Sequence, residues 1–155
     1  MTDTVPVITA TNAQDPRIQG LVAELDADLN ARYPEEQCTG GLHVHPDIRF
    51  LLAEINGSPL GCCAIQQLPD GAAELKRMYV APQARGRGIG ALLLDQAEKA
   101  AAALGYTDIR LETAIHQPEA IALYTRAGYT PITNYPPYQD KHLSRCYTKH
   151  LNPAP

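Results

Sequence analysis

Residues 74–90 read Glu-Leu-Lys-Arg-Met-Tyr-Val-Ala-Pro-Gln-Ala-Arg-Gly-Arg-Gly-Ile-Gly, and this stretch decides the fold. Its first half predicts a strand, and after Pro82 a glycine-rich turn leads into an apolar helical face. Glycines can turn their backbone N–H groups inward, and the first turn of a helix leaves unpaired donors and a partial positive charge. Arg85 and Arg87 add full charges. The stretch therefore predicts an anion site; the alternative is a tight turn with solvated arginines.

Two common nucleotide-binding loops do not fit this stretch. A Walker loop needs Gly-x-x-x-x-Gly-Lys followed by Ser or Thr, and no Lys-Ser or Lys-Thr follows these glycines. A Rossmann loop needs Gly-x-Gly-x-x-Gly after the first strand of a βαβ unit. Here the spacing is Gly86, Gly88 and Gly90, after three antiparallel strands. The anion site therefore belongs to another class.

The residues before this stretch predict an antiparallel meander. Asn56-Gly57 is a hairpin-turn signal between short apolar runs at 48–55 and 59–67. A third strand is expected at 72–80, where Leu75 and Tyr79 alternate with more polar neighbours. On this alternation Leu75 and Tyr79 share one face of the sheet.

The rest of the chain predicts further strands and helices in mixed order. The other strands are expected at 5–9, 108–114, 129–133 and 143–151. Helices are expected between Asp15 and Pro34, from 89 to 104, and between Pro118 and Gly128. This order predicts the mixed α/β (α+β) class, in one domain over residues 1–155 whose last four residues, 152–155, are frayed.

Composition limits the class of protein. The 155 residues are 45% hydrophobic and 19% charged, which is typical of a globular domain. The net charge of −4 and the lack of a basic run argue against a nucleic-acid partner. The first ten residues contain no basic segment followed by an apolar stretch, and no run of 18 apolar residues occurs. Neither export nor a membrane span is therefore expected. The four cysteines form no Cys-x-x-Cys pair, which favours a reduced, cytoplasmic interior.

Two motifs together resemble the GNAT superfamily of acyl-CoA-dependent N-acetyltransferases. The family signature Arg/Gln-x-x-Gly-x-Gly/Ala is similar to residues 85–90, and Gln117-Pro-Glu-Ala-Ile-Ala-Leu-Tyr-Thr-Arg-Ala-Gly-Tyr resembles its late helix. The likeness covers residues 48–130 well. It implies a central, mostly antiparallel sheet of six to seven strands, helices on both faces, and a splay between strands four and five.

The resemblance also implies a site for acetyl-CoA, the acetyl donor, without a metal. Backbone groups at the turn would bind the pyrophosphate, and those at the splay would bind the pantetheine arm. Gln117 stands where most members carry Asn. The implied cofactor-binding residues are Met78, Tyr79, Val80, Arg85, Gly86, Arg87, Gly88, Ile89, Gly90, Gln117, Ala120 and Tyr124.

Two catalytic roles follow from the resemblance. Tyr124 matches the tyrosine that donates a proton to the departing thiolate in many members, although it can also be a core residue. Glu74 is the first candidate for the base that takes the amine proton, and Glu112 is the second. The alternatives are ion pairs, of Glu74 with a neighbouring Lys or Arg and of Glu112 with Arg110.

The implied function is transfer of an acetyl group to a primary amine of a small molecule or peptide, directly and without an acyl-enzyme. The alternative is an inactive module that binds acyl-CoA as a regulator or partner. Cys62 and Cys63 suit a covalent route poorly, because an apolar strand hides a thiol. Homodimers are common in the family, and no sequence feature proves one here.

Two loop segments have no assigned role. His43 and His45 are spaced to point to one side near Cys38, but no fourth ligand at a recognised spacing is present, so a substrate loop is favoured over a metal site. Tyr135-Pro-Pro-Tyr138 can be a lid over the acceptor pocket, a plain loop or a proline-rich ligand, and the lid is favoured.

Overall fold

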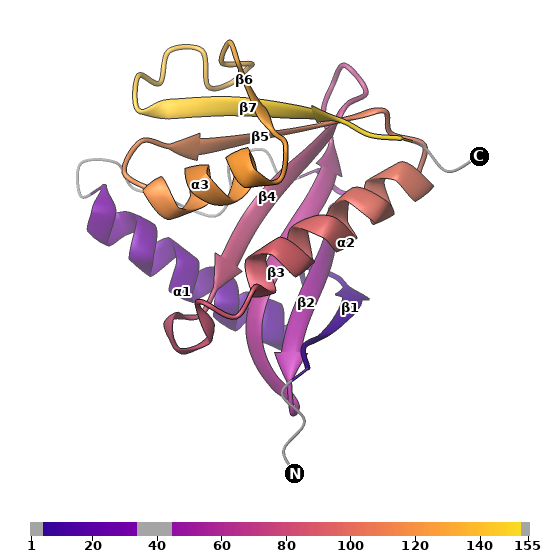
Figure 1. The fold of residues 1–155 in the computed structure, drawn as a ribbon, viewed down its shortest axis with the longest axis vertical. Helices are drawn as coiled ribbons and strands as arrows, with labels where there is room; N and C mark the ends of the chain where they lie inside the picture. Colours follow the sequence, from indigo (N-terminus) through magenta and orange to yellow (C-terminus); the bar gives the residue numbers. More distant parts are fainter. Residues whose placement is uncertain (1–4, 34–44, 153–155) are drawn as a thin grey trace.

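The computed structural model describes residues 5–33 and 45–152, which form one seven-stranded sheet with helices on both faces (Figure 1). The strands are β1 Val7–Thr11, β2 Arg49–Ile55, β3 Ser58–Gln67, β4 Ala73–Val80, β5 Asp108–Ala114, β6 Thr130–Ile132 and β7 Ser144–His150, in the order β1-β2-β3-β4-β5-β7-β6. The helices are α1 Pro16–Arg32, the 3₁₀ turn η1 Pro82–Ala84, α2 Ile89–Ala103 and α3 Pro118–Arg126. Only β4 and β5 pair in parallel among these strands.

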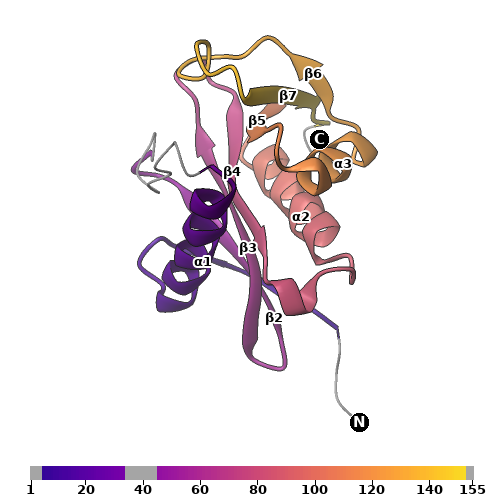
Figure 2. The same ribbon diagram turned by 90° about the vertical axis from the view of Figure 1, so that its left-hand side faces the viewer.

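This architecture confirms the predicted class, and the predicted elements match the observed ones closely. The largest shift is at β1, which starts and ends two residues later than the expected strand at 5–9. Figure 2 shows α1 on one side of β2, β3 and β4, and α2 with α3 on the other. Covered on both sides, β3 is buried from Leu60 to Gln66. No helix of the described residues has both the length and the hydropathy to cross a bilayer.

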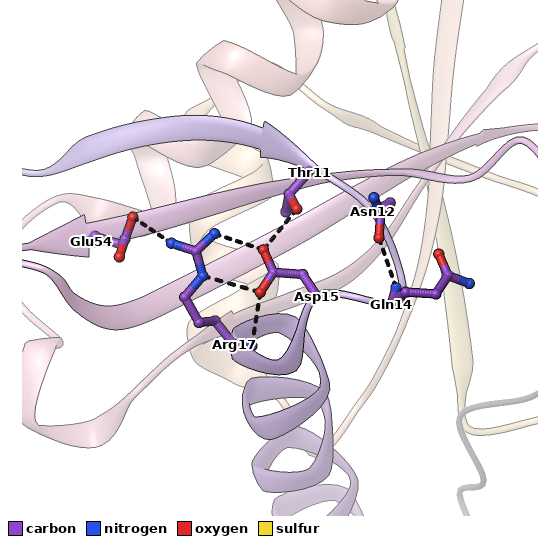
Figure 3. A network of polar contacts seen from close by, with 6 residues as sticks. All are labelled: Thr11, Asn12, Gln14, Asp15, Arg17 and Glu54. Carbon is purple, nitrogen blue, oxygen red and sulfur yellow. Dashed lines mark hydrogen bonds and ion pairs between the residues drawn. The ribbon is translucent and has the colours of Figure 1, made fainter.

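A polar network fixes the start of α1 against the sheet (Figure 3). Asp15 caps the helix, since its carboxylate accepts a hydrogen bond from the Arg17 backbone N–H at 2.9 Å. The same carboxylate accepts from the Arg17 guanidinium and from the Thr11 hydroxyl of β1, and these bonds lower the pKa of Asp15. Arg17 also contacts Glu54 of β2 at 3.2 Å. The cap thus ties α1 to two strands.

The regular alternation expected for residues 72–80 is wrong, because β4 contains a bulge. Cys62 pairs with Tyr79 and Ala64 with Lys76, so two residues of β4 lie opposite one residue of β3. Arg77, at the bulge, has φ of 59°, in the left-handed region. Because directly paired residues of antiparallel strands point to the same face, Tyr79 lies on the face of Lys76 and not on that of Leu75.

The sheet opens where β4 and β5 stop pairing. Their parallel pairs run from Ala73 with Ile109 to Leu75 with Leu111, and none follows. Beyond that point β5 stays paired with β7, whereas β4 stays paired with β3 and diverges from β5 (Figure 1). The implied splay between the fourth and fifth strands is present.

At Gly61 the side chains of α2 pack directly on β3. A Cβ there would lie 3.1 Å from the Tyr79 carbonyl oxygen and 3.2 Å from side-chain atoms of Ile89 and Leu93. We expect Gly61→Val to lower the free energy of unfolding by about 1–3 kcal/mol, because the packed neighbours cannot yield. Gly20→Ala is the control, since nothing lies within 4 Å of an added Cβ in that exposed helical position.

The control should stabilise the protein by about 0.5–1 kcal/mol, as alanine replaces glycine inside a helix. Urea unfolding of both variants measures the two values. A Gly61→Val protein as stable as the parent would show that the contact between α2 and β3 is looser than described.

Candidate active site

A cavity of about 420 Å³ fills the space between the diverging strands. It brings together four of the site residues expected from the sequence: Glu74, Met78, Gln117 and Tyr124. Glu112, the second candidate base, also lines it. The other lining residues are Leu25 and Leu29 of α1 with its C-cap Tyr33, Leu75, Lys76 and Arg77 of β4, Thr113 and Ala114 of β5, and Tyr138, Lys141, Leu143 and Ser144.

The cavity connects the two faces of the sheet. Glu74 pairs with Arg110 across β4 and β5, so Glu112, two residues further along β5, shares the face of Glu74. Lys76 lies on this face too, which α1 covers. Tyr124 comes from α3, on the other side of the sheet (Figure 2). Two reactants could therefore meet in the gap from opposite faces.

Tyr124 is both a core residue and a wall of the cavity. It is 5% exposed, and its ring packs 5.9 Å from that of Tyr129. Its hydroxyl makes no hydrogen bond with the described part of the chain, while the Tyr129 hydroxyl donates to Glu98 at 3.1 Å. Burial raises the pKa of Tyr124 well above its usual range. The hydroxyl thus keeps its proton at neutral pH, and its O–H is free to donate a hydrogen bond to a ligand in the cavity.

Glu74 is enclosed by hydrogen-bond donors. It is 1% exposed, and its carboxylate accepts from Gln66 Nε2 at 2.9 Å and from the Tyr135 hydroxyl at 2.7 Å. Lys76 Nζ lies 3.8 Å from the same oxygen that Gln66 contacts. The ion pair weighed as an alternative for Glu74 is therefore present, in addition to two hydrogen bonds.

Lys76 is a site residue that the sequence reasoning missed. Its Nζ donates to the Tyr138 hydroxyl at 3.1 Å and lies within the cavity wall. Burial lowers the pKa of Lys76, and the Glu74 carboxylate opposes this effect. Its spacing of two residues from Glu74 on a strand could have shown that both side chains face the same way.

Glu112 is half-buried and has fewer partners than Glu74. One of its oxygens accepts a hydrogen bond from Ser144 Oγ. Arg110, the ion-pair partner considered from the sequence, instead contacts Asp70. Burial raises the pKa of Glu112 above its usual range, and the Ser144 hydrogen bond opposes the shift.

The loop 133–143 is packed against β4 on the face of Glu74. Tyr135 and Tyr138 are buried, and their rings meet edge to face at 5.4 Å. The Asn134 side chain donates to the Tyr138 and Ser144 carbonyl oxygens and so closes the loop. With both rings buried, the segment is not presented as an exposed proline-rich ligand.

The histidine segment is described only in part. The backbone N–H of His45 donates to Gln66 Oε1 at 2.7 Å, and its Nδ1 accepts from the Asp47 backbone. His43 and Cys38 lie outside the described residues. The suggestion of a substrate loop there stays a prediction.

The glycine-rich turn forms a cradle of free donors. Gly86 and Gly88 have φ of 83° and 76°, and Gly88 caps α2 without a side-chain hydrogen bond. The backbone N–H groups of residues 86–91 make no hydrogen bond with any described residue. The Arg85 Nε donates to the Val80 carbonyl at 3.0 Å, so its side chain folds onto the end of β4. Arg87 is exposed.

The remaining residues expected in the site do not line the cavity. A Cβ on Gly90 would lie 3.3 Å from Leu123 of α3 and 3.8 Å from Val80 of β4, so these three elements converge. Ala120 is half-buried against the core and does not line the cavity. Tyr79 points to α1, where its hydroxyl donates to Glu24 at 3.3 Å.

Comparison with known proteins gives consistent results. The sequence profile of the acetyltransferase (GNAT) family matches residues 15–129. An IAA acetyltransferase of Azospirillum brasilense is 38% identical over 151 residues, which cover 95% of this chain and 98% of that one. A crystal structure of a Klebsiella pneumoniae protein assigned as an acyl-CoA N-acyltransferase is 35% identical, with a TM-score of 0.84 over 96% of this chain and 99% of that one.

A third match shows the fold alone. A GNAT acetyltransferase of Elizabethkingia anophelis, solved with acetyl-CoA bound, is 18% identical with a TM-score of 0.70. The match covers 94% of this chain and 98% of that chain.

Proposed function

The chain belongs to the GNAT family of acetyltransferases, and we propose that it moves an acetyl group from acetyl-CoA to a primary amine of a small molecule or peptide. The observation that carries this proposal is the cavity between β4 and β5. It has a buried tyrosine hydroxyl on one face of the sheet and two carboxylates on the other. In this proposal the tyrosine is the acid and one carboxylate is the base, on either side of one reaction space.

Acetyl-CoA fits the cradle and the gap on their own chemistry. The free N–H groups of residues 86–91 at the positive end of α2 suit a pyrophosphate. From there the pantetheine arm would follow Met78, Tyr79 and Val80 along β4, with Gln117 and Ala120 opposite. The thioester would then lie beside Tyr124.

Direct transfer needs an uncharged amine. One of the carboxylates, Glu74 or Glu112, takes a proton from the ammonium, and the neutral nitrogen attacks the thioester carbonyl carbon. The C–S bond breaks, and Tyr124 gives its proton to the leaving thiolate. The buried thiols favour this route over an acyl-enzyme, because burial raises the pKa of Cys62 to about 12 and raises that of Cys63 as well.

The alternative, an inactive module that binds acyl-CoA, is less well supported. A module without chemistry has no need of a free tyrosine hydroxyl and a carboxylate with an open oxygen in one cavity. We place the enzyme in the cytoplasm, where its thiols stay reduced. We expect no metal, nucleic acid or membrane in its function, and a homodimer, common in the family, stays a prediction.

A panel of acceptors tests the function. Release of free CoA thiol from acetyl-CoA is measured with an alkylamine, an aryl ethylamine, a polyamine, an amino acid and a peptide with a free N-terminus. Because the Azospirillum relative is named an IAA acetyltransferase, IAA is a sixth arm. At least one amine should be acetylated. Tight acetyl-CoA binding with no turnover in any arm would favour the inactive module.

Gly88→Val tests the cradle, with Gly57→Val as a matched control. Both glycines have φ near 76–78° and open space around an added Cβ, so valine should cost each variant a similar stability, about 1–3 kcal/mol. The Kd for CoA should rise only in Gly88→Val. The expected rise is about 10- to 100-fold, because one or two charge-assisted hydrogen bonds to the pyrophosphate are lost.

Calorimetry with EDTA present measures the Kd for CoA of both variants. Thermal melting measures how much stability each variant has lost. Equal CoA affinity in the two folded variants would mean that the turn has no part in binding.

Tyr124→Phe tests the proton donor. The ring keeps its packing and only the hydroxyl is lost, so kcat should fall by about 10²-fold while the Kd for acetyl-CoA stays the same. Tyr129→Phe is the control, because that hydroxyl donates to Glu98 on another part of the protein. It should lower the Tm and leave kcat unchanged. A Tyr124→Phe enzyme with parental kcat at every pH would remove Tyr124 from the mechanism.

A further inference from the structure

We propose that Glu112 is the carboxylate that takes the proton of the acceptor amine, and that Glu74 is a positioning residue that holds the acceptor side of the cavity together. The inference rests on the proposed function. It is carried by the difference between the two carboxylates in hydrogen bonding and exposure, although they share one cavity and one face of the sheet.

Both oxygens of Glu74 already accept a hydrogen bond. One accepts from Gln66 Nε2 and faces Lys76 Nζ, and the other accepts from the Tyr135 hydroxyl at 2.7 Å. The residue is 1% exposed, so little of its surface is open to an incoming ammonium. A buried carboxylate whose two oxygens each accept a hydrogen bond is suited to hold structure in place and less suited to exchange protons.

Glu74 holds in place the cavity wall on the α1 side of the sheet, where the acceptor amine would bind. Tyr135 and Lys76 are fixed directly by its carboxylate, and Lys76 in turn donates to the Tyr138 hydroxyl. Through these contacts β4 keeps the loop 133–143 packed on the sheet. The loop contributes Tyr138, Lys141 and Leu143 to the cavity. Losing Glu74 should therefore loosen acceptor binding.

Glu112 has the open oxygen that Glu74 lacks. Its Oε2 accepts from Ser144 Oγ, and its Oε1 has no hydrogen-bond partner among the described residues. The side chain is half-buried and lines the cavity. A carboxylate fixed by one oxygen and free at the other can receive an ammonium without losing an existing contact.

The surroundings of Glu112 suit a proton acceptor. Burial raises the pKa of Glu112, while Ser144, Lys76 and Lys141 oppose this shift. The other titratable groups that face it are Glu74, Tyr33, Tyr124, Tyr138 and Cys146. A base with a pKa above the usual glutamate range binds a proton from an amine more readily than an ordinary carboxylate does.

The protons balance as follows. The ammonium nitrogen gives one proton to Glu112 Oε1, which passes it to water. The neutral nitrogen forms the C–N bond, and the C–S bond breaks as Tyr124 protonates the thiolate sulfur. The second proton of the attacking nitrogen replaces the one that Tyr124 gave. The products are the amide, CoA thiol and one proton released to solvent.

Kinetics with the fastest amine of the panel separate the two roles. Glu112→Gln should lower kcat/KM by about 10²- to 10³-fold and remove the acid limb of its pH profile, because the proton acceptor is gone. Glu74→Gln should raise the KM for the amine and keep the acid limb. Tyr135→Phe removes only the bond to Glu74, so it should reproduce this rise in KM.

A pair of amines sharpens the kinetic test. Ethylamine carries a proton at neutral pH and 2,2,2-trifluoroethylamine does not, so Glu112→Gln should slow acetylation of the first far more than that of the second. Equal losses with the two amines would overturn the assignment. So would loss of the acid limb in Glu74→Gln with its retention in Glu112→Gln.

A second measurement needs no turnover. Butylammonium chloride is titrated into the CoA complex of protein labelled with ¹³C at the glutamate carboxyl carbons, and each signal is assigned by its absence from Glu112→Gln or Glu74→Gln. The Glu112 signal should titrate at higher pH than that of a free glutamate. Addition of butylammonium should shift the Glu112 signal and leave the Glu74 signal where it was. If Glu74→Gln does not fold, the signal that Tyr135→Phe perturbs identifies Glu74.

The kinetic and the NMR measurements distinguish failure of the Glu112 assignment from failure of the proposed function. A butylammonium-induced shift at Glu74, or at neither carboxyl, would overturn the assignment of Glu112. Failure of every amine in the panel would instead overturn the proposed function, and the carboxyl signals would still report which group faces the amine.

Discussion

The site depends on one structural fact, that β4 and β5 stop pairing after Leu75 and Leu111. In a continuous sheet the backbone separates the side chains of the two faces, and groups on opposite faces cannot meet. Here β5 turns away while it remains paired with β7, and the space left between the strands becomes a cavity. Tyr124 reaches it from the side of α3, and the carboxylates reach it from the side of α1. A shared reaction space follows from the missing hydrogen bonds.

The two sides of the gap differ in charge. On the α1 side, Glu74 is matched by Lys76 at 3.8 Å, and the neutral Ser144 hydroxyl is the only group in the described part of the chain that hydrogen-bonds to Glu112. That side therefore offers a partly buried carboxylate with one oxygen free of hydrogen bonds from described residues, which favours a bound cation such as an ammonium. At the start of α2, free N–H groups and the helix dipole favour an anion. The same gap thus has complementary sites for an anionic donor and a cationic acceptor.

Local signals in the sequence explain what could be predicted. Asn56-Gly57 and the glycine-rich turn determine backbone conformations directly, so the hairpin and the start of α2 followed from the sequence. The pairing of Gln66 with Glu74 could also have been found, because a tight turn at 69–71 places 67 opposite 73. Docking of Tyr135 on Glu74 joins residues 61 positions apart, and no local pattern encodes it.

The bulge was missed for a different reason, and it shows why α1 matters to the site. An arginine in the left-handed region costs about 1–3 kcal/mol, so no sequence rule places Arg77 there. Contacts from α1 hold it: Arg77 donates to Asp26 at 3.2 Å, and the Tyr79 hydroxyl donates to Glu24. Without the bulge, the period of two along β4 would turn Tyr79 to the α2 face and shift every later residue by one position. The strand would then present different backbone groups to the gap. Although α1 lies outside the residues 48–130 that resemble the family best, it therefore helps to set the register of the strand along which the donor would lie.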